Sequence, residues 1–142
     1  MSESIDVSTI TEYGLFNIKA GKLLYHDEDG DTQLGVAWSG NHAGKNNPDM
    51  CAIRDIGPLP PGWYEVGEPF VNPATGPFSM RLTPHEDNKM YGRDAFLIHG
   101  PSQDPEHYGQ ESKGCVVSPR PIRERFHQLH PHWLKVITGE EE

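Results

Sequence analysis

Two residues in the C-terminal half of the chain carry side chains that together can perform nucleophilic chemistry. The thiol of Cys115 is a useful nucleophile only as the thiolate, and an unperturbed thiol with a pKa of about 8.5 is only a few per cent ionised at neutral pH. It therefore needs a base. His99 lies sixteen residues upstream, at the end of an apolar run, and histidine is the most common general base in proteins. The pair predicts a cysteine nucleophile with His99 as its base.

The residues next to Cys115 favour the same chemistry. Gly114 lets the backbone approach a substrate closely, the N–H groups of the Ser112-Lys113-Gly114-Cys115 turn offer an oxyanion hole, and Lys113 adds positive potential. Taken singly, a histidine that ends an apolar strand and a cysteine in a core strand are more often structural. Their joint arrangement favours a catalytic pair.

The other histidines and the second cysteine are weaker candidates. His107 is the rival base, but it lies in a polar stretch without rigid support. Three further histidines cluster near the C-terminus: His127, His130 and His132. They lack the cysteine or carboxylate spacing of a metal site, so we expect surface histidines, no metal and no cofactor. We interpret Cys51 as a small buried hydrophobic residue, with a disulfide to Cys115 as the alternative.

Short apolar runs separated by turn signals predict the β-rich framework that positions this pair. His99 ends the run 95–98 and Cys115 opens the run 115–117, so both are expected at the ends of neighbouring buried strands. The polar stretch 101–113 between them is expected to be a loop or lid. Further strands are expected over residues 15–18, 22–25, 33–38, 63–66, 78–82 and 133–137, the first three as an antiparallel meander.

Two more segments flank the expected site. Residues 39–61 are rich in Gly, Pro and Asn and form a long loop, which in a compact domain is more often functional than accidental, so we expect it to border the site. After residue 117, Ser118 is expected to cap one short helix, because two prolines follow it and apolar residues then recur at helical spacing up to residue 129.

Length and charge narrow the functional classes. The chain has 142 residues, which suits one domain, and a formal net charge of -9, which opposes binding to nucleic acid. No apolar run has the length of a membrane span, and residues 1–6 lack the basic and apolar regions of a signal peptide. We therefore expect a chain made in the cytoplasm, with neither nucleic acid nor membrane as its partner.

The spacing of these residues is similar to that of a known signature. His99-Gly100 followed by Ser112-Lys113-Gly114-Cys115-Val116-Val117 resembles the YkuD-type L,D-transpeptidase signature, in which a histidine precedes a Ser/Thr-His-Gly-Cys element by a similar interval. The present sequence lacks the histidine of the Ser/Thr-His-Gly-Cys element. With Trp38-Ser39-Gly40 and the stretch 57–64 upstream, it looks like the type VI secretion L,D-transpeptidase effectors, over roughly residues 13 to 138.

The resemblance implies a fold and a division of the chain. The fold is mainly β, a single-domain L,D-transpeptidase-like β-sandwich or barrel with one short helix after the cysteine. Residues 1–12 would be an N-terminal extension, residues 13–138 the catalytic domain and residues 139–142 an acidic tail.

The resemblance also implies residue roles. Cys115 would form the acyl-enzyme, His99 would be the general base, and the carbonyl of Gly100 would orient the imidazole, with Ser112 and Gly114 completing the catalytic element. The implied partners are tetrapeptide stems of peptidoglycan that contain meso-diaminopimelate, a secretion machinery that delivers the protein into the periplasm of target bacteria, and a cognate immunity protein.

Two departures from the housekeeping enzymes bear on the reaction. Lys113 stands where those enzymes carry histidine, and Val117 stands where they usually carry a polar or basic residue. The expected reaction is therefore either hydrolysis or exchange of the terminal D-residue, or cross-linking. The predicted function is a cysteine L,D-carboxypeptidase or D-amino-acid exchange enzyme that acts as an antibacterial effector toxin. The alternatives are a catalytically impaired peptidoglycan-binding module of the same fold and a plain antiparallel scaffold.

Substrate binding needs local positive charge, because stem peptides carry carboxylates and the protein is acidic. Arg120 lies five residues beyond Cys115 in a turn flanked by prolines and is the main candidate, with Lys113 second. We assign Tyr108 to substrate binding with them. The alternative for Arg120, and for nearby Arg123, is an exposed surface role on the helix.

Overall fold

The computed structural model describes residues 5–139, so residues 140–142 of the expected acidic tail and residues 1–4 of the expected extension lie outside the described part. The strands within it are β1 (Tyr13–Asn17), β2 (Lys22–Asp27), β3 (Gly30–Val36), β4 (Gly62–Val66), β5 (Phe70–Asn72), β6 (Gly76–Pro84), β7 (Phe96–His99), β8 (Val116–Val117) and β9 (Trp133–Ile137). The helices are α1 (Arg120–Gln128) and three single-turn 3-10 helices, η1 (Val7–Thr9), η2 (His42–Gly44) and η3 (Pro48–Met50).

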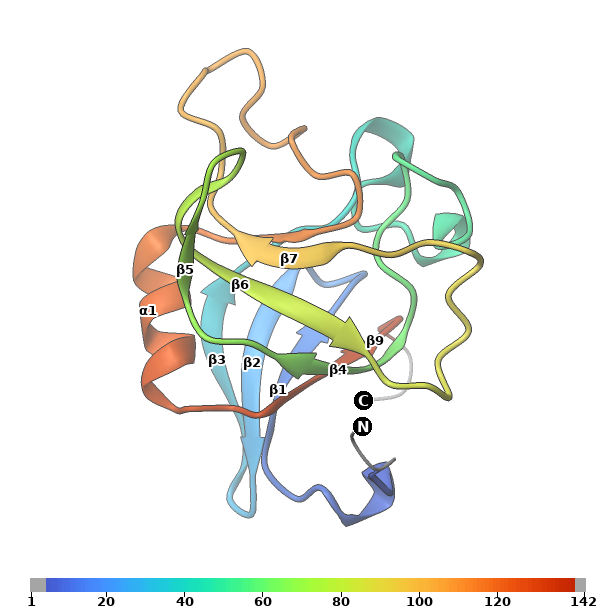
Figure 1. Ribbon diagram of the computed structural model, residues 1–142, viewed down its shortest axis with the longest axis vertical. Coiled ribbons are helices and arrows are strands. Elements are labelled where there is room, and N and C mark those ends of the chain that lie inside the picture. Colours follow the sequence, from blue (N-terminus) through green and yellow to red (C-terminus); the bar gives the residue numbers. More distant parts are fainter. Residues whose placement is uncertain (1–4, 140–142) are drawn as a thin grey trace.

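The strands form one mixed sheet with the order β3-β2-β1-β9-β4-β6-β7-β8, and β5 pairs with β6 off this path (Figure 1). The meander expected at the start is confirmed, because β1, β2 and β3 pair antiparallel. The sheet is not antiparallel throughout, since β9 pairs parallel with β1 and β7 pairs parallel with β8. The first and last strands of the domain therefore lie side by side.

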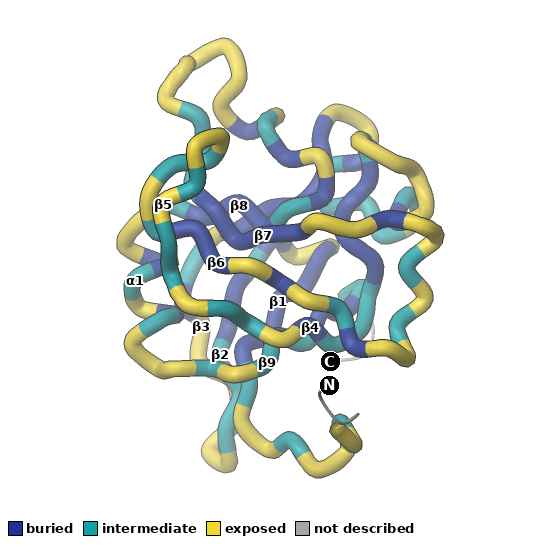
Figure 2. The backbone as a smooth tube through the Cα atoms, in the orientation of Figure 1, coloured by how far each residue is buried: buried dark blue, intermediate teal, exposed yellow. Residues whose placement is uncertain are grey.

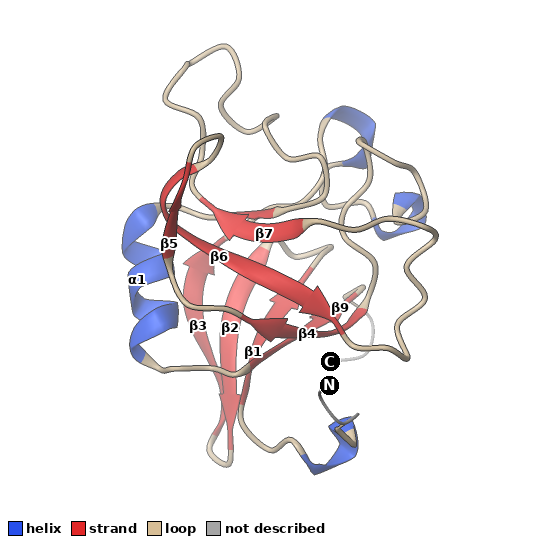
Figure 3. Cartoon of the chain, viewed as in Figure 1, coloured by secondary structure: helices blue, strands red, loops and turns tan. Residues whose placement is uncertain are grey.

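Hydrogen bonds join the two edges of this sheet. Just beyond β3, the Trp38 N–H donates to the Val117 carbonyl at 2.9 Å, and the Val117 N–H donates back to Trp38 at 2.7 Å. The hydroxyl of Ser118 adds a bond to the Val36 carbonyl at 2.7 Å. The sheet thus curls back on itself (Figure 3), which confirms the predicted mainly β, sandwich-like or barrel-like fold.

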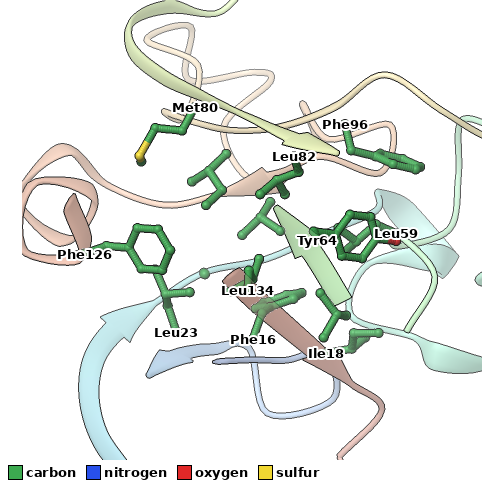
Figure 4. Close-up of a cluster of buried hydrophobic side chains, with 14 of the residues drawn as sticks. Phe16, Ile18, Leu23, Leu59, Tyr64, Met80, Leu82, Phe96, Phe126 and Leu134 are labelled. Carbon is green, nitrogen blue, oxygen red and sulfur yellow. The ribbon is translucent and has the colours of Figure 1, made fainter. Parts of the chain in front are cut away.

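The core fills the space enclosed by this curled sheet, because alternate residues of each strand point inward. Tyr64 and Phe96 meet edge to face there, with ring centroids 6.4 Å apart. Burial is concentrated in the strands and in parts of the loop 39–61, whereas the loop after β7 is mostly exposed (Figure 2). The large buried side chains labelled in Figure 4 are Phe16, Ile18, Leu23, Leu59, Tyr64, Met80, Leu82, Phe96, Phe126 and Leu134.

Helix α1 packs one face on the sheet, as its apolar spacing predicts. It buries Phe126 in the core, and Gly14 on β1 makes room for that ring, because a Cβ at Gly14 would collide with it. The expected cap is wrong: the N-cap residue is Pro119 without a side-chain bond, since the hydroxyl of Ser118 is used by the Val36 carbonyl. Within residues 5–139, no helix combines the length and the apolar character that a membrane span requires.

Candidate active site

The parallel pairing of β7 with β8 brings His99 and Cys115 to one face of the sheet. Ile98 pairs with Val116 and His99 pairs with Val117, so Cys115, directly before β8, lies across from Leu97. Residues opposite each other on neighbouring strands point to the same face of the sheet, and along one strand every second residue does so. Leu97 and His99 therefore share the face of Cys115, and His99 is its diagonal neighbour. The Leu97 N–H donates to Sγ of Cys115 at 3.3 Å.

The imidazole of His99 is held in the form that a general base needs. Its Nδ1 lies 2.8 Å from the Gly100 carbonyl oxygen. Because a carbonyl only accepts, Nδ1 must carry the hydrogen, which leaves Nε2 as the basic nitrogen. Burial lowers the pKa of His99, while the Gly100 carbonyl and the Glu111 carboxylate oppose this effect and Arg123 adds to it. The ring is therefore neutral at neutral pH.

The thiol of Cys115 is protonated at rest. Burial raises its pKa above the ordinary value, and the Leu97 N–H and the Arg93 guanidinium only partly compensate. A neutral thiol beside a neutral imidazole becomes a nucleophile when its proton moves to Nε2. The structure thus favours transfer of this proton during the reaction over a standing thiolate.

Ser112 fixes the turn that carries Cys115. Its fully buried hydroxyl accepts from the N–H groups of Gly40 at 2.8 Å and Gly114 at 3.1 Å, and it donates to the Cys115 carbonyl at 2.5 Å. The Gly114 N–H, expected as an oxyanion-hole donor, is thus used within the turn. Gly114 has a φ of 127°, a conformation that side chains rarely adopt, and a Cβ there would lie 2.5 Å from the Phe96 ring.

The long loop 39–61 supports this turn from behind. The Ser39 hydroxyl donates to the Gly114 carbonyl at 2.8 Å, and the Asn41 amide donates to the Ser112 carbonyl at 2.7 Å. The expectation that this loop borders the site holds in part, because it contacts the turn but contributes no residue to the cavity beside His99. Its role is mechanical support.

A cavity of about 740 Å³ opens beside His99. Its walls are the β5–β6 hairpin at residues 73–77, the segment 99–103 and the start of α1, with His107, Glu111, Arg120 and Arg123. The loop after β7 arches above the sheet near that hairpin (Figure 1). His99 stands at the cavity wall, whereas Cys115, which is partly exposed, does not line the cavity.

The two arginines at the cavity differ in their freedom. Arg120 is exposed, donates to Glu124 at 3.0 Å and lies over the Phe78 ring, 4.6 Å from its centroid. Arg123 is buried and donates to three carbonyls: Ser118 at 2.8 Å, Pro77 at 3.1 Å and Phe78 at 2.7 Å. Arg120 is therefore available to a ligand, whereas Arg123 holds the cavity wall together.

Four other residues from the sequence analysis lie at the edge of the site or outside it. The Lys113 side chain is exposed, and the Tyr108 ring lies 5.7 Å from Trp38; neither lines the cavity. His107 lines the cavity but is exposed, with Nδ1 2.8 Å from Asp104. Cys51 is buried and, like Cys115, free, and burial raises the pKa of its thiol to about 11.

Comparison with known proteins places this geometry in a family. A family model described as the Tlde1 domain matches residues 34–138. The chain belongs to the Tlde1 domain family. This is the type VI L,D-transpeptidase effector family, so the predicted relationship to YkuD-like L,D-transpeptidases is confirmed, and its members act on peptidoglycan. No curated protein matches this Tlde1 domain in sequence.

Two solved structures share the fold. Bd1075 of Bdellovibrio bacteriovorus aligns with a TM-score of 0.58 at 15% identity, over 95% of this chain and 50% of that one. The helical cell shape determining protein Pgp2 from Campylobacter jejuni aligns with a TM-score of 0.54 at 17% identity, over 89% of this chain and 47% of that one. The Tlde1 domain spans about half the length of these proteins, and at such identities the likeness concerns the fold alone.

Two charged residues of the site were not predicted from the sequence. Glu111 accepts from the Ser102 N–H at 2.6 Å, the Trp38 indole at 2.9 Å and the Gly109 N–H at 3.3 Å. It thereby closes the base of the loop above the cavity. Burial raises the pKa of Glu111, but these donors outweigh it, and the net shift is downward.

The second is Arg93, which donates to the Lys113 carbonyl behind Cys115 at 3.2 Å. Its only sequence signal is its position in a polar stretch just before the apolar run of β7.

Proposed function

We propose that this Tlde1 domain is a cysteine acyl-transfer enzyme that removes or exchanges the terminal D-residue of peptidoglycan tetrapeptide stems. One observation carries the proposal: His99 has its Nδ1 hydrogen held by the Gly100 carbonyl and its Nε2 unprotonated, on the same sheet face as Cys115 and at the wall of a cavity. Family membership supports the choice of peptidoglycan as substrate.

The reaction begins with proton transfer. The thiol proton of Cys115 passes to Nε2 of His99 as Sγ attacks the carbonyl of the third stem residue. A C–S bond forms, the C–N bond to D-alanine breaks, and the departing amine takes the proton from the imidazolium. The thioester is then resolved by water, which gives a tripeptide stem, or by the amine of another D-amino acid, which gives an exchanged stem.

Arg120 is proposed to bind the terminal carboxylate of the stem. It is exposed at the cavity, and its single charged partner, Glu124, lies on the same exposed helix face, so a ligand carboxylate can replace that surface ion pair at little cost. Lys113 and Tyr108, which lie outside the cavity, are proposed to contact more distant parts of the stem.

The biological setting is proposed from family membership. The domain, proposed to span residues 13–138, would act as an antibacterial toxin that secretion machinery delivers to the periplasm of target bacteria, and an immunity protein would protect the producing cell. A second candidate function is a peptidoglycan-binding module without turnover. Two observations favour that candidate: the pKa of Cys115 is raised, and Cys115 is absent from the cavity lining.

The test is incubation of the protein with purified tetrapeptide muropeptides and added D-methionine, followed by mass spectrometry. Tripeptide products support hydrolysis, D-methionine products support exchange, and dimers support cross-linking. All of these must vanish in Cys115→Ala. Binding of muropeptides without any conversion by the wild type would support the binding module instead.

A further inference from the structure

Arg93 is a buried cation that donates its hydrogen bonds to backbone carbonyls. Its side chain lies in the segment before β7 and is 6% exposed, and no carboxylate among residues 5–139 forms an ion pair with it. Its guanidinium instead donates to four backbone carbonyls: Cys51 at 2.5 Å, Pro58 at 2.7 Å, Gly57 at 3.0 Å and Lys113 at 3.2 Å. A buried charge is costly unless it is hydrogen-bonded, so its presence here calls for an explanation.

Three of these carbonyls belong to the loop 39–61, and the fourth belongs to the turn that carries Cys115. The guanidinium also lies over the Phe96 ring, 5.3 Å from its centroid. A Cβ on Gly114 would come within 2.7 Å of Nη2, so the charge lies directly beneath the residue that precedes Cys115. Arg93 thus joins the supporting loop to the nucleophile turn.

Among residues 5–139, Arg93 is the charged group that shifts the pKa of Cys115. The buried imidazole of His99, whose pKa is lowered, lies on the same sheet face as Cys115. From its own turn it neighbours Lys113, whose side chain is exposed. The Arg93 guanidinium lowers the pKa of Cys115 against the effect of burial.

The groups that face Arg93 from the core side carry no charge at neutral pH. Burial raises the pKa of both Cys51 and Tyr64, so both stay protonated. Arg54 and Asp55, which belong to the loop 39–61, act on Arg93 from exposed positions with opposite signs. The positive charge of Arg93 is therefore not neutralised by these groups and acts on the turn that carries Cys115.

We propose that Arg93 is a positioning residue for the nucleophile: it clamps the 112–115 turn to the loop 39–61 and supplies the fixed positive charge beside which the Cys115 thiolate forms. The inference rests on the proposed function in taking Cys115 as the nucleophile. A plain structural clamp would need the hydrogen bonds of Arg93 and not its charge. The two roles therefore differ in what they predict for the ionisation of the thiol.

The experiment measures the rate of Cys115 alkylation by iodoacetamide against pH, in a Cys51→Ala background so that a single thiol reacts. Arg93→Gln keeps an N–H donor and removes the charge, and Arg93→Lys keeps the charge and loses the planar fork. Arg93→Gln is expected to shift the pH profile to the alkaline side and to slow alkylation at neutral pH by about tenfold. Arg93→Lys is expected to keep a profile close to that of the parent.

Arg123→Gln is the matched control, because it also removes a buried arginine that donates only to carbonyls. Arg123 lowers the pKa of His99 and is not among the charges that act on Cys115. We therefore expect its loss to reduce the melting temperature without an alkaline shift of the thiol profile. An equal alkaline shift in both variants would mean that loosening of the fold alone accounts for the effect, and would overturn the proposal.

A folded Arg93→Gln protein with the parent profile would also overturn the proposal and leave Arg93 as a structural clamp. If Arg93→Gln fails to fold, Arg93→Lys decides the question, since a parental profile supports the role of the charge and an alkaline shift refutes it. Alkylation requires no peptidoglycan. A wild type that alkylates as described but converts no muropeptide would therefore overturn the proposed function alone.

Discussion

Ser112→Ala removes the hydroxyl that fixes the turn carrying Cys115, and its cost can be worked from the three hydrogen bonds that this hydroxyl makes. Each bond contributes about 1 kcal/mol net, and a buried polar group left without a partner costs about 1–3 kcal/mol. The Gly40 and Gly114 N–H groups and the Cys115 carbonyl all lose their partner. Partial relaxation of the turn recovers some of this, so we expect a loss of about 2–4 kcal/mol in the free energy of unfolding.

Thermal and chemical unfolding measure this loss, and Ser118→Ala is the matched control. Ser118 is equally buried but makes one side-chain bond, to the Val36 carbonyl. We expect about 1 kcal/mol for Ser118→Ala. At roughly 4 °C per kcal/mol for a domain of this size, the melting temperature should fall by about 8–16 °C in Ser112→Ala and by about 4 °C in the control.

Activity gives the second readout. Ser112→Ala should lower kcat/KM because the nucleophile turn loses its fixed geometry, whereas Ser118→Ala should stay near the wild-type value. Equal losses of stability in the two variants would refute the argument from hydrogen bonds. A large loss of activity in a fully stable Ser112→Ala protein would mean that Ser112 acts on the reacting atoms and not through the turn.

Three further predictions concern the base, the ligand contact and the pH dependence. His99→Ala should lose activity on muropeptides far more than His107→Ala, because His107 is exposed and already paired with Asp104; the reverse ranking would move the base to His107. Arg120→Ala should raise KM for tetrapeptide stems by about 1–2 kcal/mol, somewhat below a buried charge-assisted bond because Arg120 is exposed; an equal effect on a C-terminally amidated stem would exclude carboxylate binding. Because burial lowers the pKa of His99, its neutral form persists below the ordinary range and the acid limb of kcat/KM should lie below about pH 6.5. Glu111→Gln removes a carboxylate that raises this pKa, so the limb should move to still lower pH, and a move to higher pH would contradict this electrostatic effect.

The sequence predicts those parts of the fold whose signals are local. Turn residues and alternating apolar runs were enough to place most strands, and the apolar spacing after residue 120 was enough for α1. Strand β5 was missed because it is only three residues long and its central Val71 is exposed. The Ser118 cap was mispredicted because the acceptor of its hydroxyl, the Val36 carbonyl, lies 82 residues away.

The candidate site divides in the same way. Cys115 and His99 stand out in the sequence because their spacing and flanking glycines form a local pattern. Their supports do not, because each depends on contacts between distant segments. Glu111 meets Trp38 across 73 residues, and Arg93 meets the Cys51 carbonyl across 42. Nothing local distinguishes such residues from the exposed charges of an ordinary loop.

The central claim is that Cys115 forms a covalent thioester with the stem peptide, and mass spectrometry of the trapped acyl-enzyme tests it most directly. The protein is mixed with a tetrapeptide stem, quenched in acid within a turnover and digested for peptide mapping. We expect a tripeptidyl adduct on the peptide that contains Cys115, present in Cys51→Ala and absent from Cys115→Ala. Stem conversion without any adduct on Cys115, or an adduct on Cys51, would contradict it.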